Sequence, residues 1–130
     1  MNQFDLKNRT AIITGGAQGF GFDIAKRFLK SGAKVIIWDI DKNELLKASK
    51  ELNSHNLSYN IVDVSSYDQV QSTSSEIIKK SNIDILINNA GITGSTASVW
   101  EYDEEEWYKI ININLMGTFN CCQSIVPNMI

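Results

Sequence analysis

Four short apolar runs alternate with helical patterns along this chain, and this alternation constrains its fold more than any other feature. Each run is rich in β-branched residues: "TAIIT" (10–14), "KVIIW" (34–38), "YNIVDV" (59–64) and "IDILIN" (83–88). Short, continuous apolar runs of this kind indicate strands that are buried on both faces. Such strands joined by helical crossovers form a parallel sheet, so we predict a doubly wound α/β domain over residues 1–130.

The segments between the runs carry helix signals. From Phe20 the apolar side chains recur at helical spacing, and Gly32 supplies a C-terminal stop. Capping patterns precede the other three helices: Asp41 with Glu44, Ser65 with Asp68, and Asp103 with Glu106. We predict that the last helix turns toward the core a stripe of residues spaced three and four apart: Trp107, Ile110, Ile111, Asn114, Leu115, Thr118, Phe119 and Cys122.

Composition and charge argue against several classes of protein. Acidic and basic residues are mixed along a chain of net charge −3, which leaves no basic footprint for a nucleic acid. The N-terminal segment lacks the apolar core of a signal peptide, and no apolar stretch reaches the length of a membrane span. The adjacent Cys121 and Cys122 suit small buried thiols in a reducing compartment, and His55 suits a solvated loop. We therefore expect a cytoplasmic protein with no metal site, nucleic-acid partner or membrane contact.

The stretch "TGGAQGFG" (14–21) places four glycines between the first strand and the first helix. Open parallel sheets bind ligands at the carboxyl ends of their strands, and a helix N-terminus offers unpaired N–H groups to a phosphate. Gly15 suits a tight turn, Gly19 a close approach of the backbone to a pyrophosphate, and Gly21 a close contact between helix and sheet. The spacing G-x-x-x-G-x-G departs from the strict fingerprint G-x-G-x-x-G, and a loop that only needs positive φ angles is the alternative.

Asp39 ends the second run, 18 residues after Gly21. An acidic side chain about 20 residues beyond such a loop accepts hydrogen bonds from ribose hydroxyls and repels a 2′-phosphate. No arginine near Asp39 or in the loop reverses this preference, and Gln18 occupies the nearest loop position. We predict that the chain binds NAD in preference to NADP, with a solvated aspartate at a strand end as the alternative.

Three later motifs follow the glycine stretch: "VDV" (62–64), "NNAG" (88–91) and "ININLMGTF" (111–119). In this order and spacing the chain resembles the short-chain dehydrogenase/reductase family over essentially all of its length. The resemblance implies a Rossmann-type sheet of strand order 3-2-1-4, an adenine contact at Asp63, and cofactor contacts along Asn88–Gly91. The predicted cofactor-binding residues are Gly15, Gly16, Gln18, Gly19, Phe20, Gly21, Asp39, Ile40, Asp63, Val64, Asn89, Ala90 and Gly91.

Asn114 is an amide in the middle of the apolar stripe of the last helix. An unpaired polar group at a buried position costs roughly 1–3 kcal/mol, so its amide should be hydrogen-bonded. Two interpretations are compatible. One is a bond that holds two elements together at a kink in the helix. The other is the role that the resemblance implies, a catalytic asparagine that binds a water in a proton relay.

The chemistry of this family also needs a Tyr-x-x-x-Lys pair, whose lysine lowers the pKa of the phenol, and a serine that orients the substrate carbonyl. None of the four tyrosines has a lysine four positions later: Tyr59, Tyr67, Tyr102 and Tyr108 are followed there by Asp63, Gln71, Glu106 and Asn112. We therefore expect the N-terminal half of such an enzyme, with the sheet truncated after the fourth strand and its following helix. The chain alone should be inactive, and it should expose an apolar patch that includes Phe119 and part of the Ile83–Ile87 strand.

The leading functional hypothesis is an NAD-dependent oxidoreductase that moves hydride between nicotinamide and a carbonyl or secondary alcohol. Sugars, polyols, hydroxy acids and 3-oxoacyl groups all remain open as substrates, and the loop at 92–102 either touches substrate or is flexible and solvated. The resemblance implies a homo-oligomer when the chain is full length. The second hypothesis is a truncated module that binds NAD or a partner without turnover. A nucleotide-binding methyltransferase is disfavoured by "NNAG" and the Asn114 helix.

Overall fold

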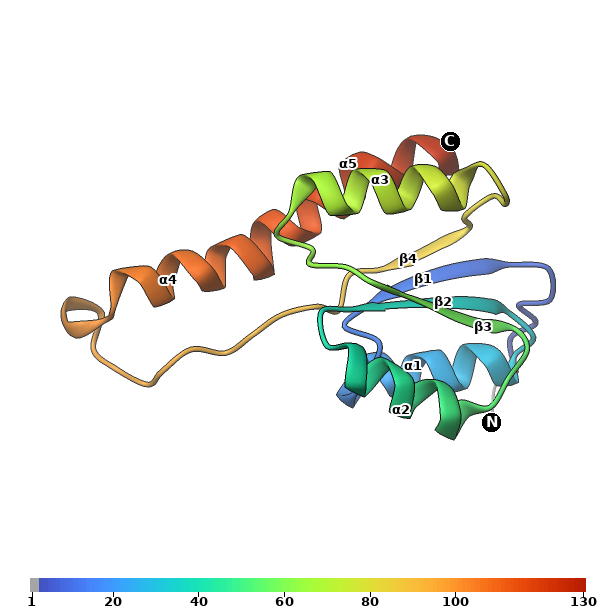
Figure 1. Ribbon diagram of the computed structural model, residues 1–130, viewed down its shortest axis with the longest axis horizontal. Coiled ribbons are helices and arrows are strands. Elements are labelled where there is room, and N and C mark those ends of the chain that lie inside the picture. The colour runs from blue at the N-terminus through green and yellow to red at the C-terminus, as the bar shows by residue number, and fades with distance from the viewer. Residues whose placement is uncertain (1–2) are drawn as a thin grey trace.

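The structure, a computed structural model, describes residues 3–130 (Figure 1). Its strands are β1 (Thr10–Thr14), β2 (Lys34–Asp39), β3 (Leu57–Ile61) and β4 (Ile85–Ile87). Its helices are α1 (Gly19–Lys30), α2 (Lys42–Leu52), α3 (Tyr67–Ile78), α4 (Glu104–Ile111) and α5 (Gly117–Met129). A single 3₁₀ turn (Val99–Glu101) precedes α4, and a π-helical segment (Asn112–Met116) joins α4 to α5.

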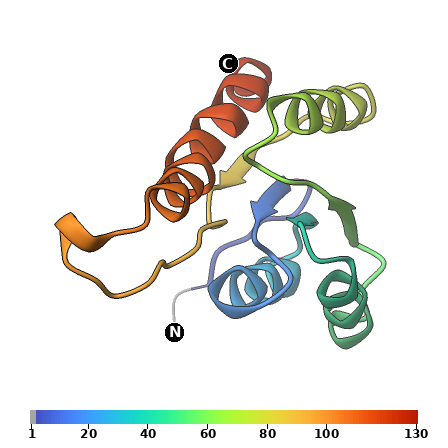
Figure 2. The same cartoon turned by 60° about the vertical axis from the view of Figure 1, so that its left-hand side comes forward.

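The four strands form one parallel sheet in the order β3-β2-β1-β4, which confirms the predicted fold class and strand order. Helices α1 and α2 cover one face of the sheet, and α3 and α5 cover the other (Figures 1 and 2). The side chains of successive residues of β1 point to opposite faces of the sheet, as the pleat requires. Ile13 packs with Ala25 and Leu45 on the α1–α2 side, whereas Ile12 packs with Val70 and Ile125 on the α3–α5 side.

Two strands are shorter than, or displaced from, the predicted runs. The third strand occupies Leu57–Ile61 and not 59–64, because its partner β2 ends at Asp39, which pairs with Ile61. Beyond that pair the backbone turns, so the residues at 62–64 lie in a loop at the sheet edge. The fourth strand is limited to Ile85–Ile87 and not 83–88, since its ladder with β1 includes only three residue pairs.

The third helix begins one residue later than predicted. Ser66, and not Ser65, is its N-cap, and the Ser66 hydroxyl oxygen accepts from the N–H of Gln69 at 3.3 Å. Ser65 instead donates from its hydroxyl to Asp63 Oδ1 at 2.6 Å. The N-caps predicted at Asp41 and Asp103 are confirmed, since each carboxylate accepts from the backbone three residues on.

The predicted inward stripe of the last helix is wrong over most of its length. The buried residues are Gly117, Asn120, Cys121 and Ile125, whereas the exposed fractions of Trp107, Leu115 and Phe119 are 51%, 62% and 54%. A π-helical turn inserts one residue into the helical repeat. The side chains after this turn therefore no longer lie on the helix face that the three- and four-residue spacing predicts from α4. Phe119 thus lies in an exposed apolar surface as expected. Of the Ile83–Ile87 run, part of which was predicted to be exposed, Ile83 is buried and Ile85–Ile87 are partly exposed.

Residues 92–116, here called the arm, extend away from the sheet (Figures 1 and 2). The arm contains the loop after β4, the 3₁₀ turn, α4 and the π-helical segment. No residue of α4 is buried. The arm therefore lies beside the core and adds little to it within the described residues.

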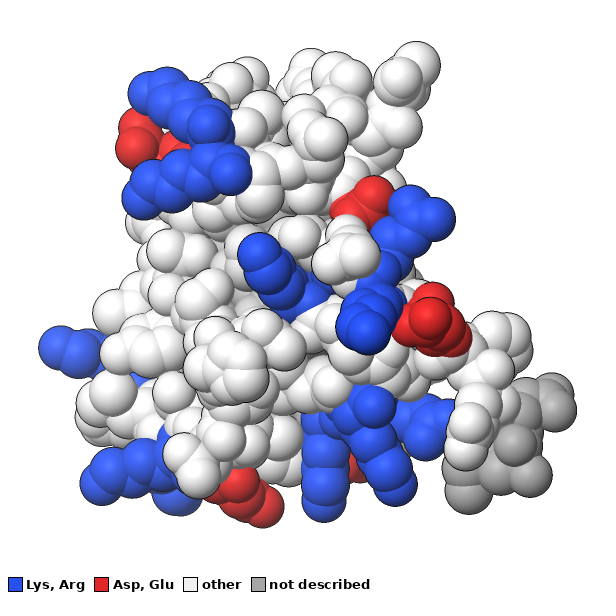
Figure 3. Space-filling model, turned by 90° about the vertical axis from the view of Figure 1, so that its right-hand side faces the viewer, with Lys and Arg blue, Asp and Glu red and all other residues white. Residues whose placement is uncertain are grey.

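Lysine and arginine side chains gather on the face at the amino ends of the strands (Figure 3). Helices α1 and α2 end toward this face with Arg27, Lys30 and Lys50 in their last turns. Cations at helix C-termini are stabilised by the helix dipole, which explains this gathering without a ligand. The candidate site lies at the opposite edge, where the C-terminal ends of the strands and the N-termini of helices α1, α2 and α3 are found.

Candidate functional site

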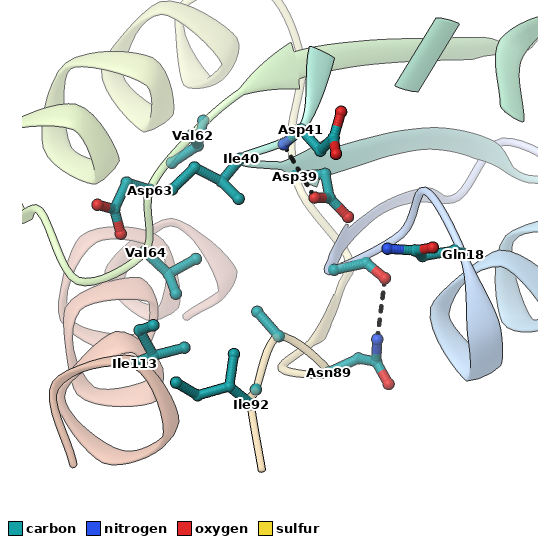
Figure 4. Close-up of a pocket in the computed structure, with 13 residues that line it drawn as sticks. Gln18, Asp39, Ile40, Asp41, Val62, Asp63, Val64, Asn89, Ile92 and Ile113 are labelled. Atoms are coloured by element: carbon teal, nitrogen blue, oxygen red, sulfur yellow. Dashed lines mark hydrogen bonds between the residues drawn. The ribbon is translucent and has the colours of Figure 1, made fainter. Parts of the chain in front are cut away.

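A pocket of about 310 Å³ lies at the carboxyl ends of the strands (Figure 4). It is lined from all four β–α connections by Gly15, Gln18, Asp39, Ile40, Asp41, Val62, Asp63, Val64, Asn89, Ala90, Gly91, Ile92 and Ile113. Ligands of open parallel sheets bind at this edge. The predicted residues of four separate sequence motifs therefore meet around one cavity.

The glycine loop leaves backbone open at the N-terminus of α1. Gly19 has a φ of +61°, and a Cβ added to it would find no atom within 4 Å, so a ligand can approach the backbone there. Gln18, the N-cap residue, makes no side-chain capping bond, and the first turn of α1 contains no acidic residue. A helix start of this kind presents N–H groups and partial positive charge to an anion.

Gly21 meets a different requirement from Gly19. A Cβ at this position would collide with the carbonyl oxygen of Gly15 and lie 2.6 Å from Asn89 Nδ2. Asn89 uses that amide to donate to the Gly15 oxygen at 3.0 Å. Gly21 is thus the residue that lets α1 close onto the sheet, as predicted for it.

Asp39 ends β2 and is half-buried, with both carboxylate oxygens engaged by backbone. Its Oδ2 accepts from the N–H of Ala17 in the glycine loop at 3.3 Å, and its Oδ1 accepts from the N–H of Asp41 at 3.1 Å. These bonds set the carboxylate at the rim of the pocket, between Gln18 and Ile40 (Figure 4).

Thr14 joins the first strand to the segment after the fourth. Its buried hydroxyl oxygen accepts from the N–H groups of Asn89 and Ala90 at 3.1 and 3.0 Å. The hydroxyl also lies 3.4 Å from the carbonyl oxygen of Ile87, to which it donates. The "NNAG" segment is therefore held against the glycine loop by one side chain 75 residues earlier in the chain.

Asn114 lies in the π-helical segment and is exposed, so its predicted buried position is wrong within the described residues. Both polar atoms of its amide are nevertheless bonded: Oδ1 accepts from the N–H of Ile92 at 2.8 Å, and Nδ2 donates to the Ile92 carbonyl at 2.9 Å. Asn114 thus holds two elements together at an irregular turn of the helix, which agrees with the first interpretation of this residue. Its role toward a water stays a prediction.

Most of the predicted cofactor residues line the pocket, namely Gly15, Gln18, Asp39, Ile40, Asp63, Val64, Asn89, Ala90 and Gly91. Gly16, Gly19, Phe20 and Gly21 do not line it. Gly16 packs against Ile37, while Phe20 is 83% exposed at the start of α1. Sequence reasoning missed the lining residues Asp41, Val62, Ile92 and Ile113. Three of these are apolar, and no sequence pattern separates an apolar pocket wall from core.

The loop at 92–102 is bonded to α4. None of its residues is buried, so the solvated part of the second interpretation is confirmed, whereas its flexibility and its contact with substrate stay predictions. Ser95 donates from its N–H and its hydroxyl to the Glu106 carboxylate at 2.7 and 2.9 Å. Gly94 packs against Tyr102 so closely that a Cβ would collide with the phenol oxygen. Partial burial, with the negative charge of Glu106 as the second cause, raises the pKa of Tyr102.

The two cysteines are free. Burial, followed by the neighbouring Cys122, raises the pKa of Cys121 to about 12, which keeps this thiol protonated and unreactive. Between residues 3 and 130 no cluster of His, Cys, Asp and Glu side chains has the makings of a metal site. In the same range no helix combines the length and apolar character that a membrane crossing requires.

Comparison with known proteins gives one consistent result. The family model described as short chain dehydrogenase matches residues 9–130. The 3-oxoacyl-[acyl-carrier-protein] reductase of Chlamydia trachomatis is 40% identical over 129 residues, covering 96% of this chain and 52% of that protein. The 2-dehydro-3-deoxy-L-rhamnonate dehydrogenase (NAD(+)) of a Sphingomonas species is 36% identical, covering 94% of this chain and 49% of the relative.

The solved structures agree with the sequence relatives. A 3-ketoacyl-(acyl-carrier-protein) reductase from Brucella melitensis, complexed with NADH, superposes with a TM-score of 0.90 at 32% identity. The match covers 95% of this chain and 51% of that one. The chain therefore spans about half the length of the relatives it matches.

Proposed function

The chain belongs to the short-chain dehydrogenase family, and we propose that it is the dinucleotide-binding half of an NAD-dependent oxidoreductase. The complete protein would transfer hydride between nicotinamide and a carbonyl or secondary alcohol. The observation that carries the proposal is the position of Asp39 at the rim of a pocket that also includes the open glycine loop.

The residues present fit a dinucleotide. The open backbone at Gly19 and the uncapped start of α1 suit a diphosphate. Asp39 would accept from the hydroxyls of the adenosine ribose, and Asp63 with Val64 would hold the adenine. Asn89 to Gly91 lie on the other side of the glycine loop, where the nicotinamide half would bind. When bound, this cofactor supplies the hydride acceptor or donor.

NAD is proposed over NADP because of charge. Asp39 and Asp41 both line the pocket, and neither forms an ion pair within residues 3–130. A 2′-phosphate would meet two carboxylates there and no cation. The names of two relatives support this choice, since one states NAD(+) and the other describes a complex with NADH.

The acid–base residues of the reaction are proposed to lie beyond Ile130, in the half of the protein that the relatives have in addition. No tyrosine of this chain is followed by lysine four positions later, so the chain alone is proposed to be inactive. Asn114 would contribute to a proton relay. The substrate stays within the classes named above, since relatives carry names of both a 3-oxoacyl reductase and a sugar-acid dehydrogenase. We further propose that the complete protein is a cytoplasmic homo-oligomer.

Cofactor titration tests the role of Asp39. In the complete gene product, Asp39→Ala should weaken NADH binding at least about tenfold and narrow the preference over NADPH, by the loss of a charge-assisted hydrogen bond. Asp41→Asn is the matched control: it removes a charge at the same rim but keeps the cap of α2, and it should change NADH affinity less than about twofold. Equal NADH affinity in wild type and Asp39→Ala would overturn the proposal.

Reading the gene past the codon for Ile130 separates the enzyme from the alternative module. A serine followed by Tyr-x-x-x-Lys supports the enzyme. A stop codon at that point, with NADH binding and no turnover, supports a non-catalytic NAD-binding module instead.

A further inference from the structure

The dipeptide Asp63–Val64 at the end of the pocket is held from three directions. Ser65 donates to Asp63 Oδ1 twice, from its hydroxyl at 2.6 Å and from its backbone N–H at 3.0 Å. Gln69 Oε1 accepts from the N–H of Asp63 at 2.9 Å. Asn120, buried on α5, donates from Nδ2 to the carbonyl oxygen of Val64 at 2.9 Å.

These bonds leave one acceptor and one donor of the dipeptide free. Within residues 3–130, no hydrogen bond reaches Asp63 Oδ2 or leaves the N–H of Val64. Figure 4 shows both residues at the side of the pocket opposite Gln18, and Asp63 and Ile113 also line the adjoining hollow. An acceptor beside a donor matches adenine, whose 6-amino group donates and whose N1 accepts. A 6-oxopurine presents the reverse pattern.

A free carboxylate can rotate and present either oxygen, or neither, to a base. The Ser65 hydroxyl and the Ser65 backbone N–H together restrict that freedom by engaging Oδ1, and the hydroxyl makes the shorter bond. This pair of bonds reserves Oδ2 for a ligand. Fixing a group in its binding position before the ligand arrives lowers the entropy cost of binding. The Asp63–Val64 backbone needs the same restraint, which Gln69 and Asn120 supply from α3 and α5.

We propose that Ser65 is a positioning residue for adenine recognition, which acts through Asp63 and sets the preference for adenine over 6-oxopurine dinucleotides. The inference rests on the proposed function, because it requires a dinucleotide in this pocket. It goes further by assigning base selectivity to a side chain that lines the adjoining hollow but not the pocket itself.

The contacts of the dipeptide with α5 and its contacts with Ser65 differ in how well substitutions can be tolerated. A Cβ on Gly117 would lie 2.6 Å from Val64 Cγ2, so α5 packs directly against the valine. Substitutions at Asn120 or Gly117 would therefore disturb the buried core together with the pocket. Ser65 is only half-buried, and its backbone bond to Asp63 survives in any variant. Ser65 is for this reason the residue to test.

The experiment compares two cofactors in the complete gene product: NADH, and reduced nicotinamide hypoxanthine dinucleotide, in which oxygen replaces the 6-amino group. Wild type should bind NADH more tightly. Ser65→Ala should weaken NADH binding by about fivefold, which is about 1 kcal/mol and the net value of one ordinary hydrogen bond, because the backbone N–H of Ser65 still holds Oδ1. It should weaken binding of the hypoxanthine cofactor less than about twofold, so the ratio of the two affinities falls.

Three further variants make the outcome specific. Ser65→Thr keeps the hydroxyl and should keep the wild-type ratio. Ser65→Cys, a weak donor of similar size, should lower the ratio and guards against misfolding of the alanine variant. Ser66→Ala is the matched control, because its hydroxyl caps α3 and does not contact Asp63; the ratio should stay unchanged.

The outcomes separate this inference from the proposed function. Equal loss for both cofactors in Ser65→Ala, or no loss for either, would overturn the positioning role while NADH binding by wild type still stands. Wild type that binds neither cofactor would defeat the proposed function and this inference with it.

Discussion

The pocket and the arm are held by different kinds of contact. At the pocket, Thr14 bonds to residues 75 and 76 positions later, and its side chain is buried. In the arm, the bonds join residues 11 and 22 positions apart, Ser95 with Glu106 and Ile92 with Asn114, and all of them are exposed. A buried hydrogen bond is expensive to lose, whereas water replaces an exposed one. The pocket is therefore a product of the whole fold, and the arm depends on local clamps.

The largest effect should come from the closest backbone approach at the pocket. Gly21→Ala places a Cβ against the Gly15 carbonyl and Asn89, neither of which can move without opening the glycine loop. We expect the free energy of unfolding of the complete protein to fall by about 3 kcal/mol, with loss of NADH binding. Denaturant unfolding measures this. Gly19→Ala, with open space around its Cβ but a φ of +61°, should cost only about 1 kcal/mol. Equal losses of stability in the two variants would contradict the claim that the close contacts of Gly21 determine the effect.

Thr14→Val should have the next largest effect. Valine has the shape of threonine but leaves the N–H groups of Asn89 and Ala90 without their acceptor. We expect a loss of about 2 kcal/mol and faster amide exchange at Asn89 and Ala90. Thr10→Val is the control, because Thr10 is also buried on β1 and its hydroxyl makes no hydrogen bond within residues 3–130. Comparable losses in the two variants would contradict a bracing role for Thr14.

Asn114→Ala tests the arm at its junction with the pocket. Removal of the amide frees both the N–H and the carbonyl of Ile92, which water can then satisfy because the site is exposed. We expect a stability loss of about 1 kcal/mol or less, with loss of exchange protection confined to the loop after β4. Hydrogen exchange read by mass spectrometry distinguishes the regions. Deprotection that spreads into β1 would mean that arm and pocket unfold together.

The same contrast explains what the sequence could predict. The strand order and the meeting of the glycine loop, Asp39 and "NNAG" follow from connectivity alone, because parallel strands bring their carboxyl ends to one edge. The end of β3 does not follow from connectivity, since it depends on where β2 stops. The sequence therefore predicted a strand at Asp63 and Val64, whereas the structure has a loop there.

The sequence also could not predict polar residues whose hydrogen-bond partners lie far away along the chain. Asn120 sits in the apolar stretch "FNCC", and its partner, the Val64 carbonyl, is 56 residues away. The sequence indicated the π-helical segment only as a kink at Asn114, and it did not show that this segment changes which face of α5 is buried. A polar residue within an apolar helix was the one available hint. It led to Asn114, whose partner is nearby, and missed Asn120.

The smallest effect should come from the bonds between Ser95 and Glu106 in the arm, here called the outer clamp. Glu106→Gln weakens the bonds to Ser95, but because every group there is accessible to water, we expect no measurable change in global stability. The readout is Tyr102, whose pKa is raised by partial burial and then by the charge of Glu106. Removal of that charge should lower the pKa of Tyr102 without returning it to 10.0, because burial persists. Alkaline absorbance titration against Tyr102→Phe reports this phenol alone, and Glu105→Gln controls for the loss of a nearby charge that makes no bond to Ser95. A pKa that responds equally to both substitutions would mean that Glu106 acts on Tyr102 only as one charge among several, and that the outer clamp does not set the arm's structure.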